Sequence, residues 1–597
     1  MYINRINTAS SFPRKIVTNN IDKPWLRPIA QNQPKINACE HNIGIGQGIV
    51  GQGSYPVGPK TTPELYHWAT IINKISSEEG LDPFNVKFWV MNRDSLLHTA
   101  ARSGFPVRYK HWSFGQAYQE LLLPQKYGLS KLYELVINTD PCYAYLLAEN
   151  PLYSQKVVMA HVMGHSDFFK NNYMFGETNR NMLNRMSDIA TSINSISNTE
   201  NVSEKEVEDF IEKVHSIQWL IDLSTSNPRK LKVYSDKKDD LSKVSNDWGK
   251  VDVSHLPSHM DRRINDHESL TKEKELEEKR RDEAAKKNPQ HPERDVIAFL
   301  IENSTTLKPW QKKILTLMRE ESYYFVPQLQ TKIMNEGWAT YWHTKIMKHK
   351  DVVDLENVAH IGMMLGNVLA LQKFNINPYT LGYVIFKDIE ERWDKGKHGP
   401  DWEAITNMDE KENYDKKEMK GKEKILEVRK KYNDVQFLRT FFTQEIANKL
   451  QMYTWDTEPG ENIEISSKDF QDIKDRLLEM LSNGGQPLIQ VIDGNYANRG
   501  ELVLEHVHSY DLKQDYAEMT LANIKAIWGR PVHLITSNTS KDGSKKIMKI
   551  SVLDSENRIE PKDVIKRYIL KPNGENDYEC DASGKPVHRP ASGGWYF

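Results

Sequence analysis

Hydrophobic residues recur at helical spacing over two long stretches of the chain, residues 61–198 and 295–454. In the first stretch, the run at 129–172 is nearly free of charge in its middle, which is typical of a helix buried on every side. In the second stretch, residues 295–347 predict roughly three packed helices. We therefore predict a mainly α protein whose large helical domain is formed by these two parts.

Two segments lack this periodicity. Residues 1–60 are rich in Pro, Gly, Asn and Gln, which predicts an irregular N-terminal arm. Gly46 to Gly51 match the dinucleotide-binding pattern G-x-G-x-x-G, but no predicted strand precedes them and no helix follows, so we expect no nucleotide there. Residues 199–294 are dense in Lys, Glu, Asp and Arg, which predicts a charged linker or solvated helix. The alternative is an arm that docks a partner.

The pattern changes in the last part of the chain, residues 455–597. Residues 487–512 predict two strands around a Gly-Asn turn, and residues 515–529 predict a helix. Two more strands, at 531–537 and 545–555, follow it. The order β-β-α-β-β predicts a small C-terminal α+β domain.

Charge and cysteine content narrow the functional classes. With 80 basic and 82 acidic residues, the formal net charge is −2, so we expect no nucleic-acid partner. The three cysteines are far apart and form no C-x-x-C pair, which indicates a reducing compartment. The N-terminus lacks the apolar core of a signal peptide, and no apolar run reaches the roughly 18 residues of a membrane span. We therefore expect a cytoplasmic protein.

His161 and His165 form an H-x-x-x-H pair within the apolar run. A spacing of four residues on a helix places both imidazoles on one face, where they can bind a single zinc ion. Gly164 removes a side chain beside the pair and lets another element approach closely. The alternative is a pair of hydrogen-bonded core histidines.

Glu336 lies in an otherwise uncharged run of apolar and aromatic residues. A buried carboxylate is costly without a cation or several hydrogen bonds, and a metal ion is one such cation. His343 lies two turns further along the same helix face. Glu356 and His360 form another i, i+4 pair at the start of an apolar helix and can complete or enlarge the site. The candidate ligands of a divalent metal are His161, His165, Glu336, His343 and His360; zinc is the first expectation, and iron and manganese are alternatives.

The residues around Glu336 are similar to the N-E-G-[FW]-A-[ST] helix that supplies the third zinc ligand in aminopeptidases of the H-E-x-x-H type. Over a wider range, from about 61 to 550, the chain resembles the SpoVR family (stage V sporulation protein R). The matching blocks, in chain order, are FPVRYKHWSFG (105–115), INTDPCYAYLLAEN (137–150), HVMGHSDFFKNN (161–172), TKIMNEGWATYWH (331–343), NPYTLGYVIFKDIEERW (377–393) and YAEMTLANIKAIWGRPVHL (516–534).

This resemblance implies a helical core with a gluzincin-like pair of His- and Glu-bearing helices. It also implies a cytoplasmic protein associated with spore cortex formation in sporulating bacteria, or with stress responses in others. The partners it implies are a PrkA-type serine protein kinase and a YeaH-type protein with a von Willebrand A-like domain. It does not imply a particular reaction.

One position departs from the peptidase pattern. In H-E-x-x-H the Glu is the general base, and here Val162 takes its place. Asp167 or Glu356 can act as base from another angle, and Asp167 can instead orient a histidine ring. Three hypotheses follow: a metal-dependent hydrolase acting on peptide or amide bonds, a non-enzymatic regulatory scaffold, and a di-metal oxidative enzyme that also uses His343, Glu356 and His360.

Other polar residues in the matching blocks have simpler structural interpretations. His111 can face the metal site, but we expect a hydrogen-bonded core histidine. Lys170, Asn171 and Asn172 follow the metal helix and can bind a polar ligand or merely end the helix.

Cys142 is expected in the core, because no base lies near it in the sequence. His506 and His508 alternate on a predicted strand, so both point to one face. They can bind a metal, although we expect a structural role.

Overall fold

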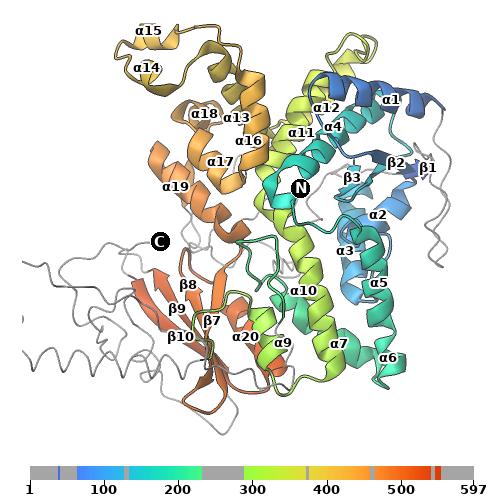
Figure 1. Cartoon of the computed structure of the whole chain (residues 1–597), viewed down its shortest axis with the longest axis vertical. Helices are drawn as coiled ribbons and strands as arrows, with labels where there is room; N and C mark the ends of the chain where they lie inside the picture. The colour runs from blue at the N-terminus through green and yellow to red at the C-terminus, as the bar shows by residue number, and fades with distance from the viewer. Residues whose placement is uncertain are drawn as a thin grey trace, which may run out of the picture. The chain divides into compact units, whose positions relative to one another are not determined.

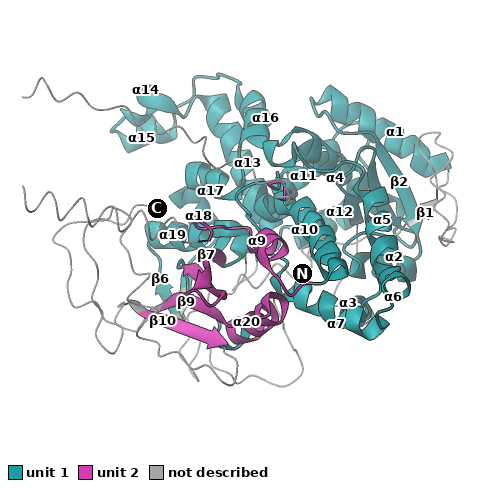
Figure 2. Ribbon diagram, turned by 60° about the horizontal axis from the view of Figure 1, so that its bottom comes forward, with its two compact units in different colours: residues 1–228, 308–487, 508–516 teal, residues 229–307, 488–507, 517–597 magenta. Residues whose placement is uncertain are grey.

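A computed structural model of the chain describes residues 38–40, 63–126, 134–231, 288–371, 376–456, 464–539 and 545–552. The chain divides into two compact units, coloured separately in Figure 2. Unit 1 consists of residues 1–228, 308–487 and 508–516, and unit 2 of residues 229–307, 488–507 and 517–597. Helices predominate in the described ranges, which confirms the predicted mainly α class. Of the N-terminal arm only residues 38–40 are described, so the glycine pattern at 46–51 lies outside the described residues.

Unit 1 contains most of the helices (Figure 1). Its longer helices are α1 (Pro63–Glu78), α2 (Arg93–Ala101), α3 (Trp112–Lys126), α4 (Leu152–Asn171), α5 (Met182–Asn194), α7 (Glu204–Ile217), α10 (Pro309–Gln330), α11 (Lys332–Ile346), α12 (Val358–Val368), α13 (Pro378–Lys395), α16 (Gly421–Lys431), α17 (Asp434–Phe441) and α19 (Phe470–Leu481). Its short elements are α6 (Ile196–Thr199), α14 (Gly399–Glu403), α15 (Met408–Glu412), α18 (Gln444–Lys449), η3 (Tyr173–Phe175), η5 (Ser482–Gly485) and the strand pair β5 (Thr454–Asp456) and β6 (Glu464–Ser467). Across the described ranges, no helix is both long and apolar enough to cross a lipid bilayer.

Unit 1 also contains a four-stranded sheet that the sequence did not predict. Its strands are β1 (Ala38–Glu40), β2 (Val86–Met91), β3 (Glu134–Ile137) and β4 (Cys142–Leu147), in the order β1-β2-β4-β3. The interpretation of the apolar run at 129–172 as helical is therefore wrong over its first part. β4 is buried at every position, as a strand covered on both faces is, and a short apolar run of this kind has no period that separates it from a buried helix.

Three helices of unit 1 pack closely enough that only glycine fits at their contacts. A Cβ atom added to Gly164 on α4 would lie 2.6 Å from the Cα atom of Ala339 on α11. One added to Gly382 on α13 would lie 2.7 Å from the Cα atom of Gly337 on α11 and closer still to the Ile333 carbonyl oxygen. Real Cβ contacts are longer than this, so α11 is held backbone to backbone between α4 and α13. The close approach predicted at Gly164 is confirmed.

The charged stretch at 199–294 is not a linker throughout. Its first part forms α7, which begins with a capping box in which the Ser203 hydroxyl accepts the N–H of Glu206 and the Glu206 carboxylate accepts the N–H of Ser203. α7 buries an apolar face that includes Phe210 and Val214. The charges therefore lie on the solvent side of a packed helix. Residues 232–287 lie outside the described residues.

Unit 2 has the predicted element order β-β-α-β-β. These elements are β7 (Leu488–Tyr496), β8 (Glu501–Val507), α20 (Gln514–Trp528), β9 (Val532–Thr539) and β10 (Lys545–Val552), and they form one sheet in the order β10-β9-β8-β7. β8 and β9 are parallel, since α20 connects them, and the other pairs are antiparallel. The unit also includes α9 (Val296–Asn303), which we had assigned to the helical core; Phe299 on α9 stacks against Trp528.

Candidate metal centre

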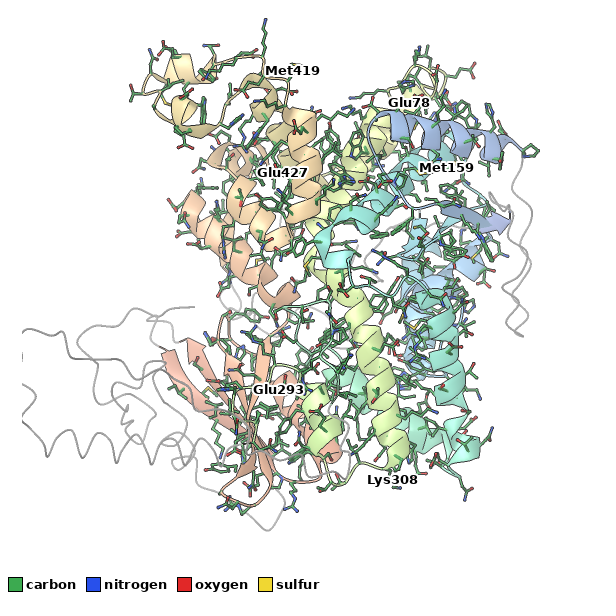
Figure 3. The ribbon with its side chains drawn as sticks, in the orientation of Figure 1. Glu78, Met159, Glu293, Lys308, Met419 and Glu427 are labelled. Atoms are coloured by element: carbon green, nitrogen blue, oxygen red, sulfur yellow. The ribbon has the colours of Figure 1, made fainter. Side chains whose placement is uncertain are left out.

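Helix α4 carries both histidines of the predicted pair and is buried along most of its length. Every residue from Ser154 to Phe169 is buried. Met159, labelled in Figure 3, marks the turn just before His161. The rings of His161 and His165 lie edge to face with centroids 4.5 Å apart. Both therefore lie on one side of the helix, as the four-residue spacing requires.

Helix α11 brings Glu336 to the two histidines, and the side chain of Glu336 has no exposed surface. The close contact at Gly164 allows this approach. The start of α11 is fixed by Asp434, whose carboxylate accepts the N–H groups of Ile333 and Met334 at 2.8 Å each. These are N-terminal donors that the helix itself leaves unpaired. Two independent contacts thus position the helix that carries the carboxylate.

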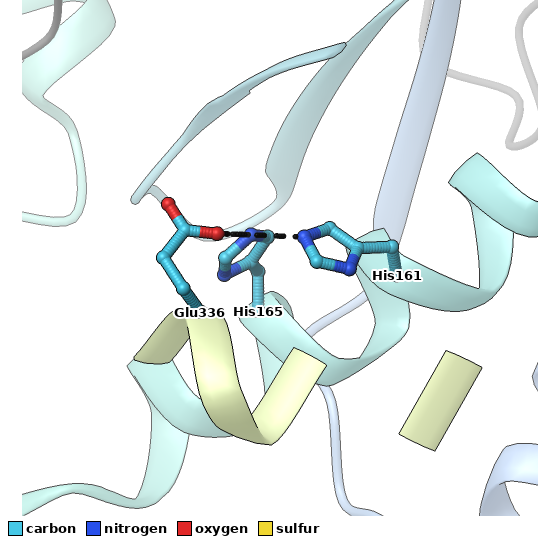
Figure 4. A group of neighbouring side chains, drawn as sticks. All are labelled: His161, His165 and Glu336. Atoms are coloured by element: carbon cyan, nitrogen blue, oxygen red, sulfur yellow. Dashed lines mark ion pairs between the residues drawn. The ribbon is translucent and has the colours of Figure 1, made fainter. Parts of the chain in front are cut away.

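One carboxylate oxygen of Glu336 faces both imidazoles (Figure 4). Its Oε2 atom lies 3.5 Å from Nε2 of His161 and 3.4 Å from Nε2 of His165. Zinc–ligand bonds of about 2.1 Å in a tetrahedron separate neighbouring ligand atoms by about 3.4 Å. Each of the three residues offers one ligand atom, and these atoms all lie within 4.8 Å of one another. The donor set, two imidazole nitrogens and one carboxylate oxygen, and its spacing therefore fit a single divalent ion.

The opposite nitrogen of each ring is also fixed. Nδ1 of His165 lies 2.9 Å from Oδ1 of Asn335, which can only accept, so this ring carries its proton on Nδ1 and leaves the Nε2 lone pair towards Glu336. Nδ1 of His161 lies 2.8 Å from Nδ1 of His343. Burial, together with His161 and His165, lowers the pKa of His343 well below its usual value, so His343 is neutral and its Nδ1 can accept a hydrogen bond from Nδ1–H of His161. Asn335 thus holds His165 in the tautomer that a metal ligand requires, and His343 offers the same arrangement to His161.

The structure therefore gives His343 a different place from the one predicted. Its ring contacts His161 through Nδ1, and the three ligand atoms that lie together come from the other residues. His343 orients a ligand in this structure, where the sequence suggested that it would be a ligand itself. The two-turn spacing from Glu336 does bring His343 to the site. There it contacts Nδ1 of His161, whereas Nε2 of His161 faces Glu336.

Lys332 completes the surroundings of the carboxylate. It lies one turn before Glu336 on α11, and its Nζ atom forms an ion pair with Oε1 of Glu336. Burial raises the pKa of Glu336, but Lys332 and the two histidines outweigh it and hold this pKa well below its usual value. Glu336 is therefore ionised, with one oxygen on Lys332 and the other facing the histidines.

The carboxylate of Asp167 has partners other than the two histidines. Its Oδ1 atom forms an ion pair with Arg429 and accepts the N–H of Asp82 at 2.7 Å, and its Oδ2 atom accepts the indole N–H of Trp338 at 2.8 Å. It also does not orient a ligand ring, since that role falls to Asn335. In the structure Asp167 ties α4 to α11 and α16, and its role as a base stays a prediction.

Glu356 and His360 do not join the site either. Both are exposed, and the ring of His360 stacks on Tyr153 with centroids 5.5 Å apart. α12 begins only at Val358, so Glu356 precedes the helix and the two residues do not form the predicted i, i+4 pair. The di-metal hypothesis thereby loses two of its proposed ligands.

This placement makes a direct prediction. Glu356→Ala and His360→Ala will leave both the melting temperature and the bound metal unchanged, because neither side chain contacts the three ligands. Metal analysis of the purified variants, with His165→Ala as the positive control for loss, provides the measurement. Loss of metal from either variant would show that the site extends to α12.

The remaining candidates have structural partners. His111 accepts the N–H of Ser113 and packs against His215, as expected for a core histidine. Cys142 is buried, and burial raises the pKa of its thiol to about 12, so it is no thiolate nucleophile. His506 bonds to the hydroxyl of Thr536 at 2.9 Å. Lys170 pairs with Asp82, and Asn171 forms hydrogen bonds with Asp82 and Asp167. Asn172 accepts the N–H of Met174 and donates to Arg429 and Tyr432. His508 lies beyond the end of β8 and forms a hydrogen bond with Asp511.

Four residues around the site were missed by the sequence reasoning: Lys332, Asn335, Arg429 and Asp434. Lys332 had a detectable signal, because Lys and Glu at i, i+4 on a helix are neighbours. Asn335 lies next to Glu336, but nothing in the sequence indicates that it faces His165. Arg429 and Asp434 come from a distant part of the chain, so only the fold reveals their contacts.

The chain is similar to proteins of one family over most of its length. The family model described as "SpoVR like protein" matches residues 60–486, and the model described as "SpoVR-like C-terminal domain" matches residues 487–539. The "Uncharacterized protein YcgB" of Escherichia coli (strain K12) is 27% identical over 527 residues, which cover 82% of this chain and 95% of that protein. No solved structure is significantly similar to the chain. The junction of the two family models falls within one residue of Pro487, where the second segment of unit 1 ends.

Proposed function

The chain belongs to the SpoVR family, and we propose that it is a metal-dependent hydrolase whose His161, His165 and Glu336 hold one divalent ion. The observation that carries this proposal is the pair of distances from one Glu336 oxygen to the two imidazoles, which suit ligands of a single ion. Zinc suits the donor set best; iron also accepts two histidines and one carboxylate.

A bound ion of this kind would supply a Lewis acid for hydrolysis of a peptide or amide bond. The residues of the chain would hold and orient its ligands: Asn335 fixes the ring of His165, and His343 fixes that of His161. Three protein ligands leave a coordination position for a substrate, whereas a structural zinc site usually has four. This count supports a catalytic role over a purely structural one.

The proton-transfer step would differ from that of the H-E-x-x-H peptidases. Val162 replaces their general base and is fully buried, and Asp167 is occupied by Arg429 and Trp338. The ring of Tyr379 stacks on that of His161, with centroids 6.1 Å apart. In such a hydrolase, the proton of the attacking water would therefore be accepted by a residue other than Val162 or Asp167, or by a basic group of the substrate.

The first test is metal content. Full-length protein made in rich medium will contain about one zinc or iron ion per chain, because the three-ligand set binds a single ion. His161→Ala and Glu336→Gln will lose it, and His360→Ala will keep it. Elemental analysis by mass spectrometry measures all four proteins. Wild-type protein without stoichiometric zinc, iron or manganese would contradict the proposal.

A second candidate function is a non-enzymatic regulator. The missing base at Val162 and the burial of all three ligands favour it. Such a regulator would act in the cytoplasm beside a PrkA-type serine protein kinase and a YeaH-type protein with a von Willebrand A-like domain, in spore cortex formation or a stress response.

His161→Ala separates the two candidates. Under the hydrolase proposal, the metal-loaded wild type will cleave a fluorogenic library of peptides and amides, and the variant will not. Under the regulator proposal, neither protein cleaves any substrate, and binding to the purified kinase depends on the metal. A variant that binds the kinase normally but fails to complement a deletion strain would argue against a pure scaffold.

A further inference from the structure

The two oxygens of the Glu336 carboxylate have different partners. Oε1 forms the ion pair with Lys332, and Oε2 faces the two histidines. Glu336 is fully buried, and the Lys332 side chain is 13% exposed. A buried carboxylate cannot rely on water for solvation, so each of its oxygens needs a partner within the protein.

We propose that Lys332 sets the affinity of the metal site by competing with the ion for Glu336. This inference rests on the metal centre proposed above and adds a regulatory role for a residue that is not a ligand. Because Lys332 pairs with Oε1, only Oε2 of Glu336 is left to bind the ion, and Glu336 is therefore a monodentate ligand. When no ion is bound, Lys332 neutralises the carboxylate and keeps the site folded.

The two roles follow from the same charge. With an ion in the site, two cations share one carboxylate at short range, and their mutual repulsion weakens binding of the ion. Without an ion, removal of Lys332 would leave Oε1 of the buried carboxylate without its partner and without a counter-charge, which is strongly unfavourable. Lys332 therefore stabilises the empty site and destabilises the filled one. The expected result is an ion that exchanges without unfolding the protein, unlike zinc in a structural site.

Lys345 offers a matched control on the same helix. It also pairs with carboxylates, Glu79 at 3.8 Å and Glu390 at 3.5 Å, but neither of these is a candidate ligand. If helical ion pairs in general affected the site through stability, Lys345→Met would act like Lys332→Met. If the charge on Glu336 is what matters, only Lys332 variants will change the affinity for zinc.

The experiment is a competition titration of full-length, metal-free protein with zinc ions against a chromophoric chelator, with melting of each empty protein measured in parallel. Lys332→Met will bind zinc about tenfold more tightly, and its empty form will melt at a lower temperature. Lys332→Gln removes the charge but can still donate a hydrogen bond to Oε1, so it will fold better and still show tighter binding. Lys332→Arg will resemble the wild type, and Lys345→Met will leave the affinity unchanged.

The outcomes separate this inference from the metal centre itself. If the wild type binds no zinc, the metal centre is wrong, and with it the role of Lys332. If the wild type binds zinc and Lys332→Gln binds it equally or more weakly, the metal centre stands and the competition by Lys332 is overturned. An equal gain in affinity for Lys345→Met would also overturn it, because the effect would then not come from the ligand carboxylate.

Discussion

Replacing Asp167 with alanine will lower the free energy of unfolding by about 3–5 kcal/mol, the range typical of removing one partner of a buried ion pair. Asp167 has no exposed surface, and Arg429, its ion-pair partner, is also buried. The substitution leaves the guanidinium of Arg429 without its counter-charge and the indole N–H of Trp338 without its acceptor. Urea denaturation of the purified variant measures the loss.

Two further variants test how much the buried charge of Asp167 contributes to the free energy of unfolding. Asp167→Asn retains an acceptor for Trp338 but removes the charge, so its loss of stability will be smaller. Asp209→Ala breaks an exposed ion pair with Lys205 and will leave the melting temperature unchanged. An Asp167→Ala protein with normal stability and lost activity would instead support the general base suggested by the sequence.

Gly382→Ala will destabilise the protein by about 3 kcal/mol or more, since it overpacks a contact between two helix backbones. The new Cβ would meet Gly337 and the carbonyl oxygen of Ile333 on α11. Neither is the end of a flexible side chain, so the helices must separate. Because α11 carries Glu336, the variant will also lose affinity for the metal ion. Chemical denaturation and metal content are the two measurements.

Gly366→Ala is the control for the same change in an open environment. Nothing lies within 4 Å of a Cβ atom added at Gly366 on α12. Alanine is favoured over glycine inside a helix by about 0.5–1 kcal/mol, so this variant will be as stable as the wild type or more so. If both variants behaved alike, the contact between α11 and α13 would be looser than the structure shows.

The ligand pair was predictable because its information is local. The separation of four positions from His161 to His165 fixes a shared helix face without any knowledge of the fold, and an isolated Glu336 in an apolar run indicates that a cation lies near it. His343 reached the site for the same reason. The predicted pairing of Glu356 with His360 depended on a helix that includes both residues. In the structure the helix begins at Val358, and sequence patterns determine helix starts poorly.

The missed features depend on contacts between distant segments. From its position near His165, Asp167 was expected to act as a base or to orient a histidine ring, whereas in the structure its carboxylate contacts Arg429 and Trp338. Likewise, β3 and β4 were interpreted as helix, because the neighbouring strands of β4 and the helices that pack on it come from separate parts of the chain. Apolar runs of six residues do not distinguish these environments.

The wide separation of the ligands along the chain has a consequence for folding. His165 and Asn335, the residue next to Glu336, are 170 residues apart in the sequence. The intervening sequence includes residues 229–307, which belong to unit 2. Of the three candidate ligands, only the two histidines lie close together in an unfolded chain, and Glu336 joins them when α4 and α11 dock. The ion would act as a cross-link that closes a long loop, so its uptake would mark the completed assembly of unit 1 and its binding energy would add directly to the stability of that unit.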